Sequence, residues 1–500
     1  MVSFFISVLA LILGYLLYGK FVERVFGPDP QRPTPAVTKA DGIDFIAMPT
    51  WKVFMIQFLN IAGTGPIFGA IMGAKFGPAA YLWIVLGCIF GGAVHDYFSG
   101  MLSLRNGGAG LPDLIGKYLG RTAKSVMLCF SVLLLVLVGA VFVYSPAVIL
   151  KDLAGNGSDT AFMIWAGVIF VYYIIATMLP IDKIIGRVYP VFAIALIFMA
   201  VALMVALIVK MPQIPEFWDG LQNRSQTWGG KGQPIWPYMF VTIACGAISG
   251  FHGTQSPLMA RCLKNEKLGR PVFYGSMITE GLVALIWAAV SSYFFFGGGA
   301  AEVGGTFADA APTVVTKVSR GWLGVFGSIL ALIGVVAAPI TSGDTALRSA
   351  RLIIADFLRF DQKPVGKRLA ISVPLFGVAA LLLWFNIANE DGFNVIWRYF
   401  GWANQTLAVF TLWAVTVYLA RERQGSYYLM TLLPACLMTA VSITYLCIAP
   451  IGFNLPPGWN RWIGAIVIAL SAALFFRWKF SKARLGGTEP KRFKYKKLME

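Results

Sequence analysis

Two stretches of sequence decide the fold: NIAGTGPIFG at residues 60–69 and TIACGAISGFHGTQSP at residues 242–257. Both lie inside long apolar runs, and both concentrate glycine and proline, which interrupt helices. Inside a membrane, unwound backbone is tolerated only where it lines a cavity or is buried in protein. We therefore expect a broken membrane helix at each stretch.

The composition around these stretches is that of a membrane protein. Of 500 residues, 58% are hydrophobic and 13% are charged, whereas soluble domains have about 45–50% apolar and about 25% charged residues. This excludes an ordinary soluble enzyme. The sequence has no H-E-x-x-H motif, no nucleophile elbow and no long connection that could form a signalling domain. We expect neither an enzyme nor a receptor.

The apolar runs predict an all-α integral membrane protein, because about 20 apolar residues cross a bilayer as a helix. The runs are too long and continuous for a β-barrel. The first run lacks the basic stretch and the cleavage site of a signal peptide, so we expect it to be a retained helix. We count about 13 spans: 3–19, 51–75, 79–104, 123–150, 161–179, 188–209, 236–256, 271–296, 321–347, 368–388, 400–420, 427–449 and 461–478.

The basic residues predict the orientation of these spans. With the N-terminus outside, most of the 41 Lys and Arg residues fall in cytoplasmic connections, as the positive-inside rule requires. The net charge of +18 is then explained by topology, without a nucleic-acid partner. We expect a multi-pass protein of the cytoplasmic (inner) membrane with a cytoplasmic C-terminus, whose final run KRFKYKK (491–497) contacts anionic lipid.

The spacing of the two breaks predicts an inverted repeat. The breaks fall in the second and seventh spans, which are five spans apart, so a second copy of the unit has the opposite orientation. Inverted repeats with discontinuous helices are typical of secondary transporters. We expect a single domain over 1–500, with an extra N-terminal helix and cytoplasmic segment (1–50), a first five-helix repeat (51–209), a second (236–420), and two extra helices with a basic tail (427–500).

The broken helices are the candidate substrate site. An unwound helix exposes amide N–H groups that attract a carboxylate, and no predicted span carries an Arg or Lys near its middle as an alternative anchor. The glycines can instead simply allow close helix packing. The amide side chains of Asn404 and Gln405, in the span 400–420, either line the cavity or hold helices together. The candidate contacts are Gly63, Thr64, Gly65, Pro66, Gly246, Ser249, Gly250, His252 and Asn404.

The ninth span contains a candidate cation site. Ala338, Thr341 and Ser342 share one helix face by their spacing, and a carbonyl with two hydroxyl groups provides hard oxygen ligands for a small cation. In the alternative interpretation, the two hydroxyl groups bond their own helix.

Three acidic residues lie within the predicted spans: Asp96, Glu280 and Asp344. Intramembrane acids are costly and mark pathways or proton relays, so each is a candidate for a proton relay. Each can also be a structural hydrogen-bonding group. His95, beside Asp96, can carry a proton or serve in helix packing.

The motifs together resemble the carbon starvation protein (CstA) family. The resemblance rests on residues 28–54, IAGTGPIFG, GGAVHDYFSG, FVTIACGAISGFHG (240–253), the 344–348 segment and FGWANQTLA (400–408). It implies a transporter of the amino acid–polyamine–organocation superfamily with the LeuT-type fold, in which helices 1 and 6 are discontinuous. The chain resembles the short form of the family, and MIQFLN replaces the two adjacent histidines that members often carry ahead of IAGxGP.

The resemblance also implies substrates and an ion. Family members are associated with pyruvate uptake and with peptide utilisation during starvation. We therefore expect cation-coupled symport of a small organic acid such as pyruvate, with peptide or amino acid uptake as the alternative. The A-x-x-T-S pattern is similar to the helix-8 part of a sodium site, whose other ligands are carbonyls here around Ile61 and Thr64. Na⁺ or H⁺ remains open as the coupling ion. We expect no cofactor and no other metal, and the sequence does not indicate an oligomeric state.

Overall fold

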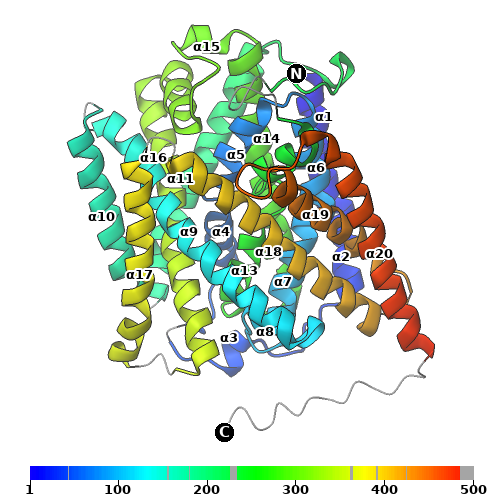
Figure 1. Ribbon diagram of the computed structural model, residues 1–500. Coiled ribbons are helices and arrows are strands. Elements are labelled where there is room, and N and C mark those ends of the chain that lie inside the picture. The colour runs from blue at the N-terminus through cyan, green and yellow to red at the C-terminus, as the bar shows by residue number, and fades with distance from the viewer. Residues whose placement is uncertain are drawn as a thin grey trace.

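The computed structural model describes residues 1–42, 44–154, 157–178, 181–225, 233–360, 364–389, 392–423 and 425–484. These residues form a bundle of helices without strands, as predicted. Figure 1 shows the long helices side by side, with α15 at one end of the bundle and α3 and α8 at the other. The N-terminus lies at the α15 end.

The helices have these bounds in chain order: α1 (Val2–Leu13), η1 (Gly14–Tyr18), α2 (Gly19–Phe26), α3 (Pro35–Thr38), α4 (Thr50–Ile61), α5 (Gly65–Ala74), α6 (Ala79–Leu86), η2 (Gly87–Gly92), α7 (Ala93–Arg105), α8 (Leu111–Leu119), α9 (Arg121–Ala154), α10 (Asp159–Met178), α11 (Ile181–Lys210), η3 (Phe217–Asp219), α12 (Ile235–Thr242), α13 (Gly250–Ala260), η4 (Glu266–Leu268), η5 (Arg270–Tyr274), α14 (Gly275–Phe296), α15 (Gly299–Glu302), α16 (Ala311–Leu358), α17 (Val365–Ala388), α18 (Gly392–Glu422), α19 (Leu429–Ile448), η6 (Pro457–Trp459) and α20 (Asn460–Arg484).

Ten of the described helices are long and apolar enough to cross a membrane, and the bent pair α4–α5 raises the number to 11. The predicted span 236–256 appears as the two short helices α12 and α13. The predicted span 321–347 lies inside α16, which departs from helical geometry at Gly324, where φ is +65°. The count of thirteen therefore stays a prediction.

Both predicted breaks are present where the glycines and prolines fall. Helix α4 ends at Ile61, and α5 begins at Gly65 with a bend of 47° between them. Pro66 lies in the first turn of α5, where its missing N–H leaves no helical bond unmade. Helices α12 and α13 are separated by residues 243–249.

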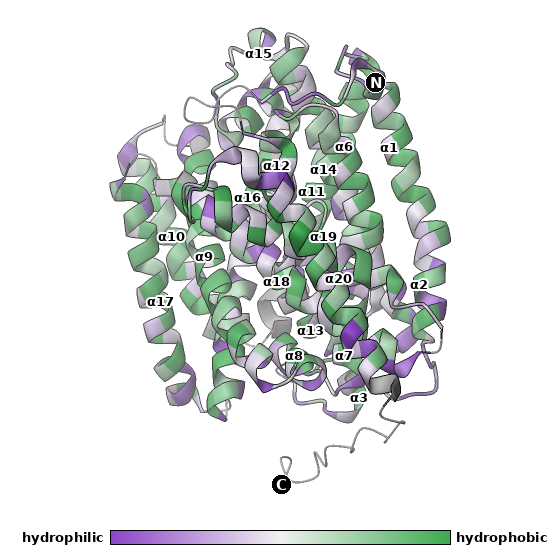
Figure 2. Cartoon of the chain, turned by 45° about the vertical axis from the view of Figure 1, so that its right-hand side comes forward, coloured by the Kyte–Doolittle hydropathy of each residue, from purple (hydrophilic) through white to green (hydrophobic). Residues whose placement is uncertain are grey.

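The broken helices occupy the middle of the bundle. Helix α13 packs against α4, α7 and α18, while α5 packs against α14 and α12. The long helix α16 packs against both α9 and α11 beside them. Figure 2 shows hydrophobic residues along the outer helices and hydrophilic residues gathered towards the two ends. Only 11% of the apolar window of α20 is buried, against 83% for Ala79–Arg105, so α20 presents an apolar surface suited to lipid.

The flanking helices pack onto the same bundle. Helix α1 lies against α6 and α14, and Glu23 of α2 accepts a hydrogen bond from Arg270 of η5 at 2.8 Å. Helix α19 packs against α18 and α20. The basic run 491–497 lies outside the described residues.

Two connections differ from their prediction. The segment between the third and fourth predicted spans contains the short helix α8, which packs against α9 and α18. Helix α16 continues past the predicted end at 347 to Leu358 and so carries Arg348 and Arg351 as buried residues. Both arginines lie beyond the predicted span 321–347, so the prediction that no predicted span carries an Arg or Lys near its middle stays a prediction.

Candidate functional site

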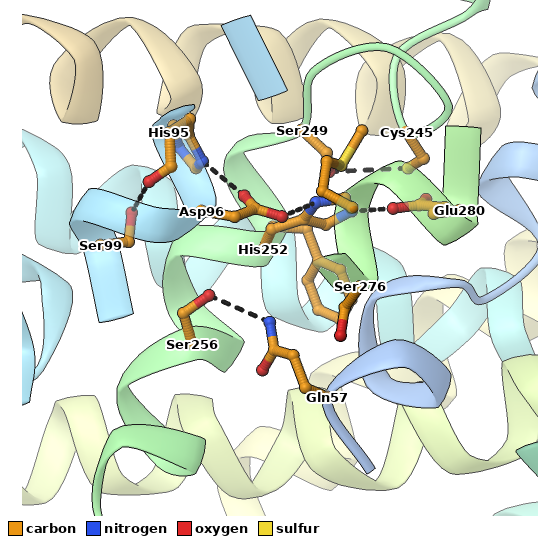
Figure 3. A network of polar contacts seen from close by, with 12 residues as sticks. Gln57, His95, Asp96, Ser99, Cys245, Ser249, His252, Ser256, Ser276 and Glu280 are labelled. Carbon is orange, nitrogen blue, oxygen red and sulfur yellow. Dashed lines mark hydrogen bonds and ion pairs between the residues drawn. The ribbon is translucent and has the colours of Figure 1, made fainter. Parts of the chain in front are cut away.

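A chain of four ionisable side chains crosses the centre of the bundle. Asp96 of α7 contacts two imidazoles: its Oδ1 lies 2.8 Å from Nδ1 of His95, and its Oδ2 lies 2.9 Å from Nδ1 of His252. The other nitrogen of His252, Nε2, lies 3.3 Å from Oε2 of Glu280 on α14. Figure 3 shows His252 between the two carboxylates. All four side chains are fully buried.

The helix break positions this chain. His252 is the third residue of α13, directly after the non-helical segment 243–249. Helix α7 brings Asp96 to one side of His252, and α14 brings Glu280 to the other. Since interactions between charges are stronger away from water, the protonation of one member must affect the others. The arrangement can hold and pass a proton.

The two carboxylates differ in how firmly they are held. Both oxygens of Asp96 accept from an imidazole. Neither oxygen of Glu280 has a hydrogen-bond partner within the described part of the chain, and its contact with His252 is an ion pair at 3.3 Å. Glu280 is therefore the less constrained acid.

The side chain of Asn404, which belongs to α18, bonds to groups at the start of α13. Its Oδ1 accepts from the backbone N of Phe251 at 2.7 Å and from Oγ of Ser249 at 3.0 Å. Its Nδ2 lies 3.4 Å from Sγ of Cys245. We expect a substrate carboxylate to accept from backbone N–H groups at this break. In this conformation the amide oxygen of Asn404 accepts from one of them, the N–H of Phe251.

The break in the other helix carries polar groups without partners. Asn60 is fully buried, and neither its Oδ1 nor its Nδ2 has a hydrogen-bond partner among the residues that the structure describes. The same holds for Oγ1 of Thr64, the residue before α5. Buried polar groups are normally paired, so these two residues are candidates for ligand contacts. Sequence reasoning missed Asn60, although it opens the motif that marks the break.

The two breaks touch each other through glycines. A Cβ atom added at Gly65 would lie 2.2 Å from Sγ of Cys245, and one at Gly69 would lie 2.8 Å from the carbonyl oxygen of Thr242. At Gly73, one turn further along α5, the nearest atom is Cγ1 of Ile243 at 2.2 Å. The close-packing role of glycine therefore applies along α5, beside the break.

Three other predicted glycines are also packing positions. A Cβ at Gly246 would lie 2.5 Å from Cβ of Ala284, and one at Gly250 would lie 2.4 Å from backbone atoms of α18. At Gly63, the nearest atoms belong to the ring of Phe142, at 2.6 Å. Gly250 thus allows two backbones to approach closely, whereas Gly246 and Gly63 leave room for side chains of neighbouring helices.

The predicted cation ligands are only partly brought together. Oγ of Ser342 lies 3.0 Å from the carbonyl oxygens of both Leu59 and Asn60, at the end of α4. The hydroxyl of Thr341 instead bonds its own helix, at 3.0 Å from the carbonyl of Ala337 and 2.9 Å from that of Ala338. The carbonyls beside Ser342 thus precede the expected Ile61 and Thr64.

Asp344 lies apart from the other two acids. Its Oδ2 accepts from the hydroxyl of Tyr189 at 2.5 Å and from that of Tyr172 at 3.1 Å. The Tyr189 hydroxyl is also 3.0 Å from the carbonyl of Thr341. These tyrosines come from α11 and α10, and sequence reasoning did not connect them with Asp344. Asp96 and Glu280 thus share one cluster, and Asp344 belongs to another.

Metal binding finds no support in this arrangement. Within the described ranges, no group of three or more His, Cys, Asp and Glu side chains has a geometry that could hold a metal ion. The four-residue chain is extended, with each imidazole between or beside carboxylates, and so resembles a relay more than a coordination shell.

Comparisons with known proteins agree with a transporter. A membrane protein of Haemophilus influenzae is 46% identical over 339 residues, covering 59% of this chain and 91% of its own. The peptide transporter CstA of Campylobacter jejuni is 26% identical over 551 residues, covering 86% of this chain and 78% of its own. The pyruvate/proton symporter BtsT of Escherichia coli is 25% identical over 350 residues, or 57% of this chain and 48% of its own.

Solved structures share the overall fold. A manganese transporter of Eremococcus coleocola superposes with a TM-score of 0.57 at 11% identity, covering 89% of this chain and 99% of its own. A Na⁺-coupled sialic acid symporter superposes with a TM-score of 0.53 at 11% identity, covering 94% and 95%. The expected all-helical transporter fold is confirmed at this level.

The family assignment rests on the length of the match. The model of the family described as carbon starvation protein CstA matches residues 1–164, 153–321 and 298–445. Its curated members among the relatives above are membrane transporters and not enzymes, as the sequence predicted. The chain belongs to the carbon starvation protein CstA family.

Proposed function

We propose that the protein is a secondary active transporter that couples uptake of a small organic acid, such as pyruvate, to entry of a cation across the cytoplasmic membrane. The observation that carries the proposal is the buried chain His95–Asp96–His252–Glu280 beside the break between α12 and α13. Ionisable groups inside a membrane protein are costly and mark substrate or proton pathways.

We propose a proton as the coupling cation. The chain contains two imidazoles and two carboxylates in contact, and imidazole is the side chain that exchanges protons most readily near neutral pH. The similarity to the pyruvate/proton symporter BtsT supports this choice. Na⁺ is the alternative, supported by Ser342 beside the carbonyls of Leu59 and Asn60 and by the fold shared with a Na⁺-coupled symporter.

The proposed substrate contacts lie at the two breaks. Asn60 and Thr64 offer buried amide and hydroxyl groups to a carboxylate and its neighbouring carbonyl. Ser249, Gly250 and His252 offer the first turn of α13 once Asn404 moves away. We propose that Gly63, Gly65, Pro66 and Gly246 shape the backbone of this site rather than bond the substrate.

A peptide is the second candidate substrate. The peptide transporter CstA of Campylobacter jejuni aligns with 86% of this chain. The observation that favours a peptide is that Asp96 and Glu280 flank His252 at the break, where the oxygens of Glu280 can accept from an α-ammonium group. A peptide requires partners for both of its termini, whereas pyruvate requires one for its carboxylate only.

Proteoliposome uptake tests the function. The full chain is reconstituted and supplied with labelled pyruvate or labelled alanyl-alanine under an inward pH gradient, an inward Na⁺ gradient or no gradient. The variant His252→Gln removes the centre of the chain. Ser99→Ala is the matched control, because among the described residues the Ser99 hydroxyl bonds only the carbonyl of His95, at 2.6 Å, on the same helix.

The expected result is pyruvate accumulation driven by the pH gradient in the wild type and in Ser99→Ala, with loss of accumulation in His252→Gln. Accumulation driven only by Na⁺ would replace the proton with Na⁺. Uptake of alanyl-alanine but not pyruvate would favour the peptide alternative. Absence of gradient-dependent uptake of any acid or peptide by the wild type would overturn the proposal.

We also propose the topology that the charge pattern predicts. The α15 end of the bundle, with the N-terminus, would face outward, and the end with α3 and α8 would face the cytoplasm. The repeats 51–209 and 236–420 would be the inverted halves of a ten-span unit within the thirteen spans, which the two breaks five spans apart support. Single cysteines are introduced into the connections that contain α15 and α8. Their labelling in intact cells tests the orientation.

A further inference from the structure

We infer that Glu280 and Nε2 of His252 together hold the single coupling proton, and that Asp96 is a positioning residue that fixes His252 for this task. The inference rests on the proposed proton-coupled transport and assigns its proton to one pair of atoms. The two carboxylates are bonded differently: both oxygens of Asp96 accept from an imidazole, whereas neither oxygen of Glu280 has a hydrogen-bond partner among the described residues. Proton-coupled transport alone does not require this difference.

Asp96 fixes the tautomer of His252. An ionised carboxylate accepts hydrogen bonds and cannot donate them. Oδ2 of Asp96 lies 2.9 Å from Nδ1 of His252, and Oδ1 lies 2.8 Å from Nδ1 of His95. Both imidazoles therefore donate from Nδ1 to Asp96. The bond made by one ring nitrogen sets the state of the other, so Nε2 of neutral His252 carries a lone pair.

The second step concerns the proton between His252 and Glu280. That lone pair faces Oε2 of Glu280 at 3.3 Å. With one proton on the pair, either a carboxylic acid faces a neutral imidazole or a carboxylate faces an imidazolium. Without it, a buried carboxylate faces a lone pair, which is costly. The pair thus binds one proton, and releasing it leaves one negative charge on Glu280.

The third step excludes Asp96 as the carrier. Two N–H groups point at its oxygens, and protonating either oxygen would cost one of these bonds. Glu280 has no such donors in the part of the chain that is described, apart from His252. The proton that comes and goes is therefore bound on the Glu280 side of His252.

Other ionisable groups around α14 leave the pair as described. Helices α1 and α5, which pack against α14, carry no ionisable side chain. The ionisable side chain in contact with Glu280 is His252, and Asp96 contacts the other nitrogen of that ring. Further groups on neighbouring elements, among the side chains that the structure describes, mostly have partners of their own. They are Cys88 of η2, whose thiol donates to the carbonyl of Met277, Lys52 in the first turn of α4, Tyr81 of α6 bonded to Ser292, Tyr97 of α7, Arg105 of α7 bonded to Glu266, Tyr189 of α11 bonded to Asp344, Lys210 of α11 and Tyr293 bonded to Glu302 of α15, Arg270 of η5 bonded to Glu23, and Tyr274 of η5 bonded to the carbonyl of Ile89.

Two transport modes separate the roles. Exchange of labelled for unlabelled substrate across the liposome needs the binding site but no net proton movement, whereas accumulation needs proton release. We expect Glu280→Gln to retain exchange and to lose accumulation driven by a pH gradient, down to the level reached without a gradient. Measured as the pH gradient that just balances an opposing substrate gradient, the wild type should carry one proton per substrate.

Asp96→Asn tests positioning. An amide replaces one accepting oxygen by a donor, so one imidazole must turn to its other tautomer. Loss of the negative charge also makes protonated His252 less favourable, so the pH profile of uptake should shift to lower pH. Ser99→Ala, which is one turn away, should leave that profile unchanged. A purely structural Asp96 would lower activity equally at all pH values.

The outcomes distinguish this inference from the proposed function. Pyruvate uptake by the wild type with full accumulation in Glu280→Gln would overturn the inference and leave the function standing. A stoichiometry of two protons would also overturn it. If Glu280→Gln does not fold, Glu280→Asp replaces it, since the acid then lies one methylene further from His252. Unchanged rate and pH profile in that variant would contradict the assignment.

Discussion

Replacing Asn404 by alanine should lower the free energy of unfolding by more than the burial of this side chain alone suggests. Oδ1 of Asn404 accepts from the backbone N of Phe251 and from Oγ of Ser249. Without it, a buried backbone N–H loses its partner, which costs about 1–3 kcal/mol, and one further hydrogen bond is lost, worth about 1 kcal/mol. We therefore expect Asn404→Ala to lower the free energy of unfolding by about 2–4 kcal/mol.

The neighbouring residue provides a matched control. Gln405 is also fully buried, but within the described residues its Nε2 donates a single bond, to the carbonyl of Phe240 at 3.0 Å. Gln405→Ala should cost about 1 kcal/mol. The assay is thermal unfolding of both purified variants in one detergent, followed by intrinsic fluorescence. Equal unfolding midpoints for the two variants would refute the argument that Asn404 caps α13.

Three further predictions follow from other parts of the bundle. Gly250→Ala should prevent folding or transport, because its Cβ would lie 2.4 Å from the backbone of α18, whereas Gly377→Ala, with no atom within 4 Å, should be tolerated; expression and size-exclusion profiles check this. If Na⁺ is the coupling ion, Ser342→Ala should raise the Na⁺ concentration for half-maximal uptake, and an unchanged value would remove that site. Glu266→Gln should lower stability by about 3 kcal/mol in thermal unfolding, because fully buried Glu266 accepts from Arg105 at 3.2 and 3.0 Å; a variant as stable as the wild type would contradict this.

The breaks could be predicted because their cause is local. Glycine and proline act on the backbone of their own residues, and the apolar run around them sets the membrane context. The placement of Asp96 and Glu280 inside helices followed from the same hydropathy. Helix α8 was missed, because a short amphipathic helix between two spans gives too weak a signal against the surrounding apolar runs.

The contacts within the site could not be predicted, because they depend on helix rotation. A helix that is apolar on all sides has no face that sequence period can orient. Nothing local therefore indicated that Asp96 would meet His252, which is 156 residues away. The same limit hid the two tyrosines around Asp344 and the accepting role of Asn404. Asn60 was visible only as a letter in a motif until its burial was known.

The glycine contacts along α5 have a mechanical consequence. With no room for a methyl group at Gly65, Gly69 or Gly73, α5 cannot tilt without carrying the backbone of residues 242–245 along with it. Helices α5 and α12, the halves of the two broken helices at the α15 end, thus form one rigid unit. The other halves, α4 and α13, meet through side chains such as Gln57 and Ser256, at 3.1 Å, which can separate and rejoin. If a path opens between these helices, α5 and residues 242–245 would move together at the α15 end, whereas at the opposite end the side chains of Gln57 and Ser256 would part.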